Sequence, residues 1–148
     1  MDVHSPEVRS RNMAAIRATN TKPELLLRRA LFALGFRYRL HVADLPGRPD
    51  ILLPKWRYAI FVHGCFFHGH GCSSFRWPRT RSKFWREKIE ANAKRDERSE
   101  AALRALRWGV LTIWECELRG AGAAKRAAAV AERLAAQITA NRHLHLDQ

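Results

Sequence analysis

The sequence predicts an α/β fold in which helices lie on the faces of a mixed sheet. The first observation behind this prediction is a pair of nearly unbroken apolar runs, RYAIFVHG at 57–64 and WGVLTIWEC at 108–116, which are typical of strands covered on both faces. The second is the order of the segments, a helix, short strands, a helix, a strand and a helix, which favours a layered sheet. With 148 residues and neither a linker nor a repeat, the chain is expected to be one domain spanning 1–148.

The first helix with predicted ends covers residues 21–35. Thr21 and Glu24 have the spacing of a capping box, in which each side chain bonds the backbone N–H of the other residue, and Gly35 is well placed to end the helix. The chain before it, up to about Thr19, is basic and weakly amphipathic, and we expect it to be helical as well. The sequence therefore predicts two helices ahead of the sheet.

Strands and helices then alternate along the chain. FRYRLH at 36–41 alternates as a strand does, and ILLP at 51–54 follows a turn and is predicted to be a second strand. Ser82 is predicted to cap a long helix that reaches about Leu106. Residues 121–148 are predicted to form a C-terminal helix of high intrinsic propensity, which packs against the sheet and ends in a short tail.

The charge of the chain points to a polyanionic partner. Lys and Arg outnumber Asp and Glu by 27 to 14, which gives a formal net charge of +13. Because self-repulsion of this size destabilises a compact fold, nucleic acid is the expected partner, ahead of an anionic membrane or a merely solubilising basic surface. No apolar run approaches the roughly 20 residues of a membrane helix. The N-terminus also lacks the apolar core of a secretion signal, so we expect a cytoplasmic protein.

The segment HGCFFHGHGC at 63–72 contains the residues of a predicted metal site. Cys65, His70 and Cys72 lie within eight residues of one another, and Cys116, at the end of the last predicted strand, can supply a fourth ligand. Three thiolates and one imidazole form the closed tetrahedral set of a structural zinc site. The alternative is that the cysteines are buried free thiols, as a reducing compartment allows, and that His70 is solvated.

Two further histidines and one aspartate are candidates for catalysis. His63 and His68 lie beside the predicted zinc site without being needed to complete it, so they are free for proton transfer or for contact with phosphate, although a surface or loop histidine is the commoner case. Asp50 enters a strand from the turn PGRPD, and it can converge with the end of the next strand to build a magnesium site for phosphodiester hydrolysis. Its alternative is an ordinary turn residue after proline.

Four stretches of the chain carry a family resemblance. They are DVHSPEVRSRNMAAIRATNTKPE at 2–24, PGRPDILLPKWRYAIFVHGCFFHGHGC at 46–72, RTRSKFWREKIEANAKRDER at 79–98 and WGVLTIWECELRG at 108–120. Together they closely resemble the very-short-patch-repair (Vsr) mismatch endonuclease family, with the C-terminal helix and tail outside the likeness. The resemblance implies a fold related to the PD-(D/E)xK restriction nucleases, with one structural zinc. It also implies magnesium-dependent nicking of duplex DNA on the 5′ side of the T in T:G mismatches, which arise from 5-methylcytosine deamination.

Position by position, the resemblance assigns roles in a candidate active site. Asp50 is implied to be the principal magnesium ligand, and the backbone carbonyl of Val62 a further metal contact. The family often has a threonine at this second position, and a carbonyl ligand tolerates that change. His68 is implied to act on the attacking water or the scissile phosphate, with Asp96 orienting it. His63, where relatives of this fold often have a lysine, is implied to contact the phosphate.

Glu24 and the zinc ligands complete the implied site. Glu24 is implied to assist through metal-bound waters, besides its role as a capping residue. Gly69 and Gly71 replace histidines that some members of the family have, and this departure removes none of the implied zinc ligands. Those ligands are the four residues reached above from their chemistry, Cys65, His70, Cys72 and Cys116.

Aromatic side chains beside the site are candidates for contact with DNA bases. The resemblance assigns intercalation to Phe66, Phe67 and Trp85, and Phe67 stands where a tryptophan is frequent, so a weaker wedge is expected. Inserting a ring between base pairs requires unstacking, and a mispaired step costs least, which is a physical source of selectivity for mismatches. The alternative for Trp85 is the core face of the long helix. Three other tryptophans are interpreted as core or sheet packing, Trp56, Trp108 and Trp114.

Basic residues near the long helix predict contacts with the DNA backbone, because arginine forks and helix N-termini both favour phosphate. Such contacts fix position without reading sequence. The N-terminal segment 1–20 is expected to form a second clamp on the DNA. The residues predicted to bind phosphate are Arg76, Arg79, Arg81 and Lys83 at the helix and Arg9, Arg11 and Arg17 in the N-terminal segment.

The leading hypothesis is a strand-nicking DNA repair enzyme that acts on double-stranded DNA containing a T:G mismatch, as a monomer associated with a bacterial nucleoid. The resemblance also suggests cooperation with mismatch-repair proteins. One alternative is a zinc-stabilised DNA-binding module without catalysis, which has no need for the candidate catalytic residues. The other is a restriction-type nuclease on the same fold, which should prefer a matched duplex.

Overall fold

The computed structural model describes residues 20–72 and 75–141, and within these ranges it contains four strands, three α-helices and one 3-10 helix. The predicted helix up to Thr19, the second DNA clamp and the C-terminal tail lie outside the described residues. In chain order the elements are α2 (Lys22–Ala33), β1 (Arg39–Leu40), β2 (Ile51–Leu53), β3 (Tyr58–His63), α3 (Ser82–Ala105), β4 (Gly109–Trp114), the 3-10 helix η1 (Glu115–Leu118) and α4 (Ala123–Ala140).

The strands form one mixed sheet in the order β1-β2-β3-β4. β1 pairs with β2 and β2 with β3 in antiparallel register, whereas β3 and β4 run parallel, joined by a connection that contains α3. The last residue of β3, His63, pairs with the last residue of β4, Trp114. The predicted mixed sheet flanked by helices is therefore confirmed.

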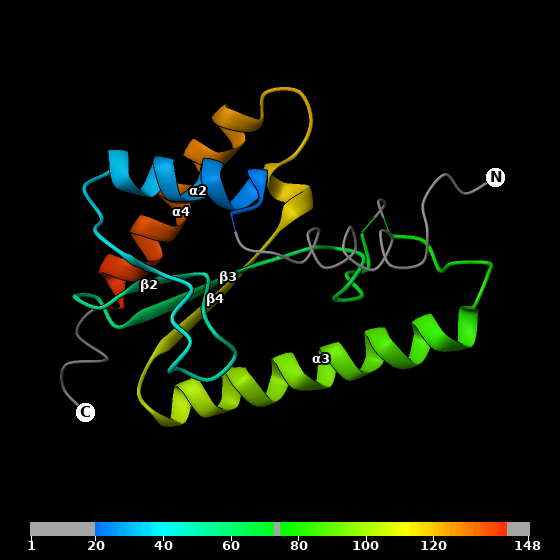
Figure 1. The fold of residues 1–148 in the computed structure, drawn as a ribbon. Helices are drawn as coiled ribbons and strands as arrows, with labels where there is room; N and C mark the ends of the chain where they lie inside the picture. Colours follow the sequence, from blue (N-terminus) through cyan, green and yellow to red (C-terminus); the bar gives the residue numbers. More distant parts are fainter. Residues whose placement is uncertain (1–19, 73–74, 142–148) are drawn as a thin grey trace.

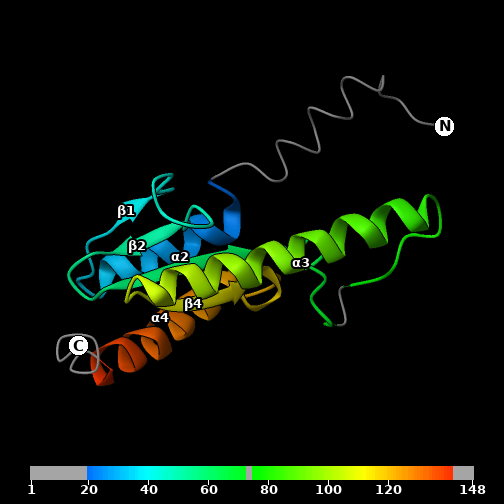
Figure 2. The same ribbon diagram turned by 90° about the horizontal axis from the view of Figure 1, so that it is seen from below.

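Helices cover both faces of the sheet. Figures 1 and 2 show α2 and α4 on one face and the long α3 across the other. Along β2 and β3, successive side chains alternate between two cores because a strand has a period of two. The larger core, under α2 and α4, includes Leu27, Leu31, Ile51, Leu53, Ile60, Leu111, Ile113 and Leu134. The smaller core, under α3, contains Val42, Leu52, Ala59, Phe61, Leu103 and Val110.

The ends of α2 follow the predicted signals in part. Thr21 accepts a hydrogen bond from the backbone N–H of Glu24 at 3.4 Å, but the Glu24 carboxylate accepts from the N–H of Asn20, at 2.9 Å, rather than from that of Thr21. Gly35 ends the helix as predicted, with φ +97°, and the N–H of Phe36 bonds the carbonyl of Leu31 in a Schellman arrangement. The predicted capping box is thus only half formed.

One prediction about a helix cap is wrong, and one predicted strand is shorter than expected. Ser82 is the first residue of α3 rather than its cap, because the capping residue is Arg81, which has a left-handed backbone and makes no side-chain cap. The strand predicted at 36–41 contains only Arg39–Leu40, because its partner β2 is short and runs directly into Pro54, which has no N–H for a ladder. The helices and strands predicted around 57–64, 108–116 and 121–140 are confirmed, each shorter than predicted at one end or both.

Within the described ranges, the helices are too short or too polar to cross a membrane.

Close packing across the parallel pair depends on a glycine. Gly109 in β4 pairs with Tyr58 in β3, and the tyrosine ring lies over it. A Cβ atom added at Gly109 would lie 2.4 Å from Cε1 of Tyr58, closer than real Cβ contacts allow. The absence of a side chain at this position therefore lets the ring lie flat against the sheet.

Replacing Gly109 by alanine is expected to lower the free energy of unfolding by about 1–3 kcal/mol, because the methyl group must displace a buried ring. Gly71→Ala is the control, since nothing lies within 4 Å of an added Cβ there. The measurement is urea denaturation of the three proteins at pH 7. Equal stability of Gly109→Ala and the wild type would contradict this account of the packing.

Candidate active site and metal cluster

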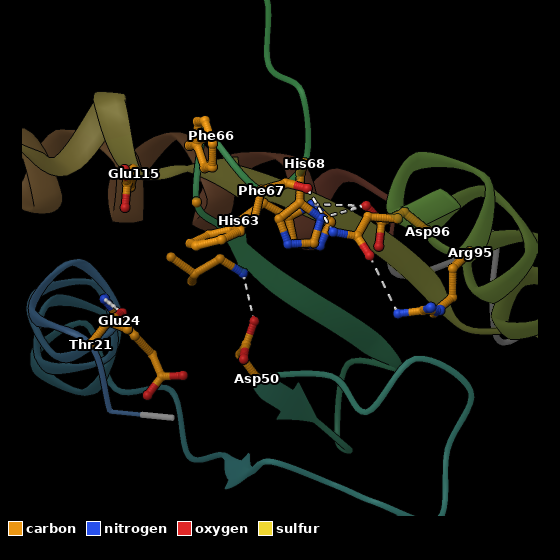
Figure 3. A pocket seen from close by; sticks show the side chains of 13 residues that line it. Thr21, Glu24, Asp50, His63, Phe66, Phe67, His68, Arg95, Asp96 and Glu115 are labelled. Carbon is orange, nitrogen blue, oxygen red and sulfur yellow. Dashed lines mark hydrogen bonds and ion pairs between the residues drawn. The ribbon is translucent and has the colours of Figure 1, made fainter. Parts of the chain in front are cut away.

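A cavity of about 350 Å³ opens where β3 ends, beside the N-terminal part of α2 and the middle of α3. Figure 3 shows Glu24 and Asp50 facing it from one side and the histidine rings and Asp96 from the other. A second cavity of about 220 Å³ shares Asp50, His63 and Asp96 with the first. The larger cavity is lined by Thr21, Glu24, Asp50, Val62, His63, Gly64, Phe66, Phe67, His68, Asn92, Arg95, Asp96 and Glu115.

Asp50 directly precedes β2 and lies against the end of β3. The backbone N–H of Val62 donates to its carboxylate at 2.8 Å, a bond that is available because β3 continues past the last residue that β2 pairs. Burial raises the pKa of Asp50 from 3.8 to about 6, in spite of the Val62 N–H, which favours the ionised form. The ionised carboxylate is therefore costly in this place without a nearby cation.

Glu24 reaches the same point from α2 and is almost completely buried. Its carboxylate accepts hydrogen bonds from His41 Nε2 at 2.9 and 3.1 Å and from Arg28 at 3.2 Å. Ligand atoms of Glu24, His41 and Asp50 all lie within 4.8 Å of one another, so these three residues could hold a metal ion. His41 is not among the residues that the sequence predicts for this site, because its place next to Asp50 follows only from the pairing of β1 with β2.

His63 and His68 form a stacked pair on the other side of the cavity. Their ring centroids lie 3.8 Å apart and their planes differ by 1°. Asp96 on α3 hydrogen-bonds Nδ1 of His68 and lies 3.9 Å from Nδ1 of His63. Burial, and then the neighbouring His68, lowers the pKa of His63 from 6.5 to about 4, so this ring is neutral at pH 7.

The four predicted zinc ligands lie together beside this pair. The ligand atoms of Cys65, His70, Cys72 and Cys116 are all within 4.8 Å of one another, so these four residues could hold a metal ion. Sγ of Cys116 lies 3.6 Å from Nδ1 of His70. Burial raises the pKa of the Cys65 thiol to about 12, so a bound cation is needed to hold it as a thiolate.

Trp114 lies between the metal-ligand cluster and the histidine pair. Its indole stacks on His70, with centroids 4.1 Å apart and planes 6° apart, and it meets His63 edge-on at 5.4 Å. The prediction that Trp114 serves core or sheet packing is therefore wrong, because the end of β4 turns its ring toward the loop after β3. Trp56 and Trp108 pack against the cores as predicted.

The three predicted intercalating residues form one aromatic group at the rim of the cavity. The ring centroid of Phe66 lies 5.1 Å from that of Phe67 and 5.2 Å from that of Trp85. Asn92 on α3 donates to the backbone carbonyl of Phe67 at 2.9 Å and so fixes the loop that carries this residue. Trp85 is half-buried and belongs to neither core, which disfavours its alternative as a core residue.

The basic residues predicted at the start of α3 are all exposed. Arg81 lies over the ring of Phe84, and Arg86 over that of Trp77, at 4.3 Å in both cases. Cations and aromatic rings thus alternate on the surface next to the aromatic group, as expected of a surface that meets nucleic acid. The predicted phosphate-binding residues at this surface are Arg76, Arg79, Arg81 and Lys83.

Comparisons with known proteins show the family of this chain. Residues 1–74 match the family model described as DNA mismatch endonuclease Vsr. The chain is 51% identical over 119 residues to the type II nicking enzyme V.XorIIP of Xanthomonas oryzae, which covers 80% of this chain and 88% of that protein. It is 47% identical over 119 residues to the DNA mismatch endonuclease Vsr of Escherichia coli, covering 80% and 76% of the two chains. A type II nicking enzyme of Neisseria meningitidis, V.NmeAIP, is 42% identical over 118 residues, or 80% and 84% of the two chains. The chain therefore belongs to the Vsr family of DNA mismatch endonucleases.

Proposed function

We propose that this endonuclease nicks duplex DNA on the 5′ side of the T in T:G mismatches left by deamination of 5-methylcytosine, in a magnesium-dependent reaction. The observation that carries the proposal is the cavity itself. Four carboxylates, a stacked histidine pair and the rings of Phe66 and Phe67 line one opening of about 350 Å³ on a strongly basic protein. A DNA phosphate lying in this opening would be close to the carboxylates, to both histidines and to the phenylalanine rings.

Asp50 and Glu24 fit magnesium, which prefers oxygen ligands and keeps several of its waters. Within a strand, the N–H and C=O of one residue point to the same side of the strand. Since the N–H of Val62 bonds Asp50, the carbonyl of Val62 also points toward Asp50. Asp50 and this carbonyl would hold the ion directly, and Glu24 would act through its waters. When bound, magnesium supplies positive charge for the phosphate and lowers the pKa of a coordinated water.

The histidine pair has the geometry for proton transfer and phosphate contact. Asp96 bonds Nδ1 of His68, which fixes the ring and leaves Nε2 to exchange a proton with the attacking water or the scissile phosphate. His63 is neutral at pH 7, so it can donate a hydrogen bond to a phosphate oxygen without bringing a charge. The aspartate would also stabilise positive charge that forms on His68 during the reaction.

We further propose that Cys65, His70, Cys72 and Cys116 bind one structural zinc ion. Three sulfurs and one imidazole suit zinc rather than magnesium, and four protein ligands close the coordination sphere. The ion would fix the loop 64–72, which follows β3 and carries Phe66, Phe67 and His68 to the cavity. Such a site contributes directly to folding free energy.

A fold related to the PD-(D/E)xK nucleases is part of the same proposal. The order of α2, three antiparallel strands, α3 and a parallel fourth strand supports it, and so does the placement of Asp50 at the start of β2. His63 would take the position that a lysine holds in many relatives. This substitution replaces a fixed positive charge with a neutral ring.

The proposal is tested by comparing T:G and T:A duplexes for magnesium-dependent nicking, with the cut mapped on each labelled strand. Asp50→Asn is expected to abolish nicking while DNA binding is retained. A protein that binds but never cuts would be the zinc-stabilised binding module, and one that prefers the matched duplex would be a restriction-type nuclease. Either outcome would overturn the proposed function.

Asp50→Asn should at the same time stabilise the magnesium-free protein. The folded pKa of Asp50, about 6, exceeds its unfolded value of 3.8, so the stability that this group contributes is lost as pH rises between these values. The neutral variant avoids that loss, so its free energy of unfolding at pH 7 should be about 1–3 kcal/mol higher than that of the wild type, as measured by urea denaturation. Asp44→Asn removes the same charge from an exposed site in the preceding loop and should gain nothing comparable. A destabilised Asp50→Asn protein would contradict the buried-charge account.

Cys116→Ala should lose bound zinc and lower the melting temperature, because removing a ligand withdraws binding energy that contributes to folding. The control is wild-type protein stripped of zinc by a chelator, which should melt at nearly the same temperature as the variant. Zinc content is measured by elemental analysis. A variant that keeps one zinc per chain, or a wild type that melts unchanged after chelation, would refute the structural site.

Phe67→Ala should reduce discrimination of T:G over T:A duplexes more than it weakens general DNA binding, because the lost ring acts at the unstacked step. Phe32→Ala is a useful control, since this exposed ring on α2 contacts Tyr38 and lies outside the aromatic group formed by Phe66, Phe67 and Trp85. The measurement is the ratio of dissociation constants on the two duplexes. An equal loss on both would discredit the wedge.

A further inference from the structure

One imidazole holds both ends of the buried carboxylate of Glu24. Nε2 of His41 lies 2.9 Å from Oε1 and 3.1 Å from Oε2 of this residue. Among the described residues, the other donors to this carboxylate, Arg28 and the N–H of Asn20, reach Oε2 alone. His41 is therefore the contact that fixes the rotation of the carboxylate and the direction in which Oε1 points.

The backbone of His41 is tied to the second carboxylate residue of the site. Its N–H donates to the carbonyl of Asp50 at 3.0 Å, one step beyond the pair formed by Leu40 and Ile51. His41 thus links α2, through its ring, to the start of β2, through its backbone. Because it spans both elements, it sets the spacing between Glu24 and Asp50.

His41 adopts an uncommon backbone conformation to make these contacts. Its φ is +48°, in the left-handed region, which histidine enters more readily than most residues but still at a cost. With this conformation the chain leaves the β1 ladder, and the His41 ring contacts Glu24. The His41 side chain is only 14% exposed. Strain kept at such a position is expected when the contact it allows has a function.

We propose that His41 is a positioning residue of the magnesium site, which holds Glu24 beside Asp50 in the orientation that the metal-bound waters require. This inference rests on the proposed function and adds a residue to it. Residues that orient metal ligands contribute strongly to metal affinity without touching the ion. The role needs only a proton on Nε2, so a neutral donor of similar reach should replace the imidazole.

The test compares His41→Ala and His41→Gln. Both substitutions place an ordinary side chain at the same left-handed position, so backbone strain affects them alike, and only glutamine restores a donor for Glu24. Leu40→Ala is the control for general destabilisation, because Leu40 packs against the larger core and is not one of the described residues that donate to the Glu24 carboxylate. Two quantities are measured: Mn²⁺ binding to DNA-free protein, by electron paramagnetic resonance, and the Mg²⁺ concentration that gives half-maximal nicking.

His41→Ala is expected to weaken Mn²⁺ binding about 10-fold or more and to raise the half-maximal Mg²⁺ concentration by a similar factor. Saturating Mg²⁺ should restore most of the nicking rate. His41→Gln and Leu40→Ala should both lie near the wild type. Unchanged Mn²⁺ binding in His41→Ala, or a glutamine variant no better than alanine, would overturn the proposal.

The outcomes separate this inference from the proposed function. A wild type that binds Mn²⁺ through Asp50 and loses affinity in His41→Ala, yet does not nick T:G duplexes, would sink the mismatch proposal and leave the positioning role standing. If the wild type and His41→Ala nick T:G duplexes with the same Mg²⁺ dependence, the mismatch proposal stands and the positioning role of His41 is overturned. A wild type that binds no Mn²⁺ would overturn the role of His41 as well.

Discussion

The parallel pairing of β3 with β4 is the constraint on which the rest of this site depends. Because His63 pairs with Trp114, the two strands end at the same level, and the chain that leaves β3 meets the chain that leaves β4. Cys65 and His70 thereby come close to Cys116, which lies 46 residues beyond His70 in the sequence. The extension of β3 past β2 is equally important, since it leaves the N–H of Val62 for Asp50.

Electrostatics explain why this end of the sheet needs cations. Asp50 carries a raised pKa, and a second carboxylate, that of Glu24, is buried beside it, although the protein as a whole is strongly basic. Two carboxylates that lie together in a poorly solvated place lower stability unless a partner compensates. Proteins retain destabilising groups of this kind where activity requires them. Here His41 and Arg28 bond the Glu24 carboxylate, whereas Asp50 faces the cavity.

The sequence predicts the elements whose signals are local and the site residues whose chemistry is distinctive. The apolar runs identified β3 and β4, and the chemistry of Cys65, His70, Cys72 and Cys116 identified a cluster that the structure brings together. Contacts that depend on register or on backbone conformation were missed. His41 faces Glu24 only because β1 and β2 pair in one register and because its φ is positive. Trp114 looked like a core residue because nothing local shows that its ring turns toward His70.

On the proposed function, the loop after β3 combines three tasks in adjacent residues. Cys65 would bind the structural metal, Phe66 and Phe67 would unstack the mismatched step, and His68 would act at the phosphate. Since Cys65 and His70 would both be held by one ion, the intervening rings and His68 can shift only together. The hydrogen bonds from Asn92 to Phe67 and from Asp96 to His68 brace the same loop against α3. A duplex that resists the wedge would therefore also fail to bring its phosphate to the histidine, so recognition and cleavage would share one rigid unit.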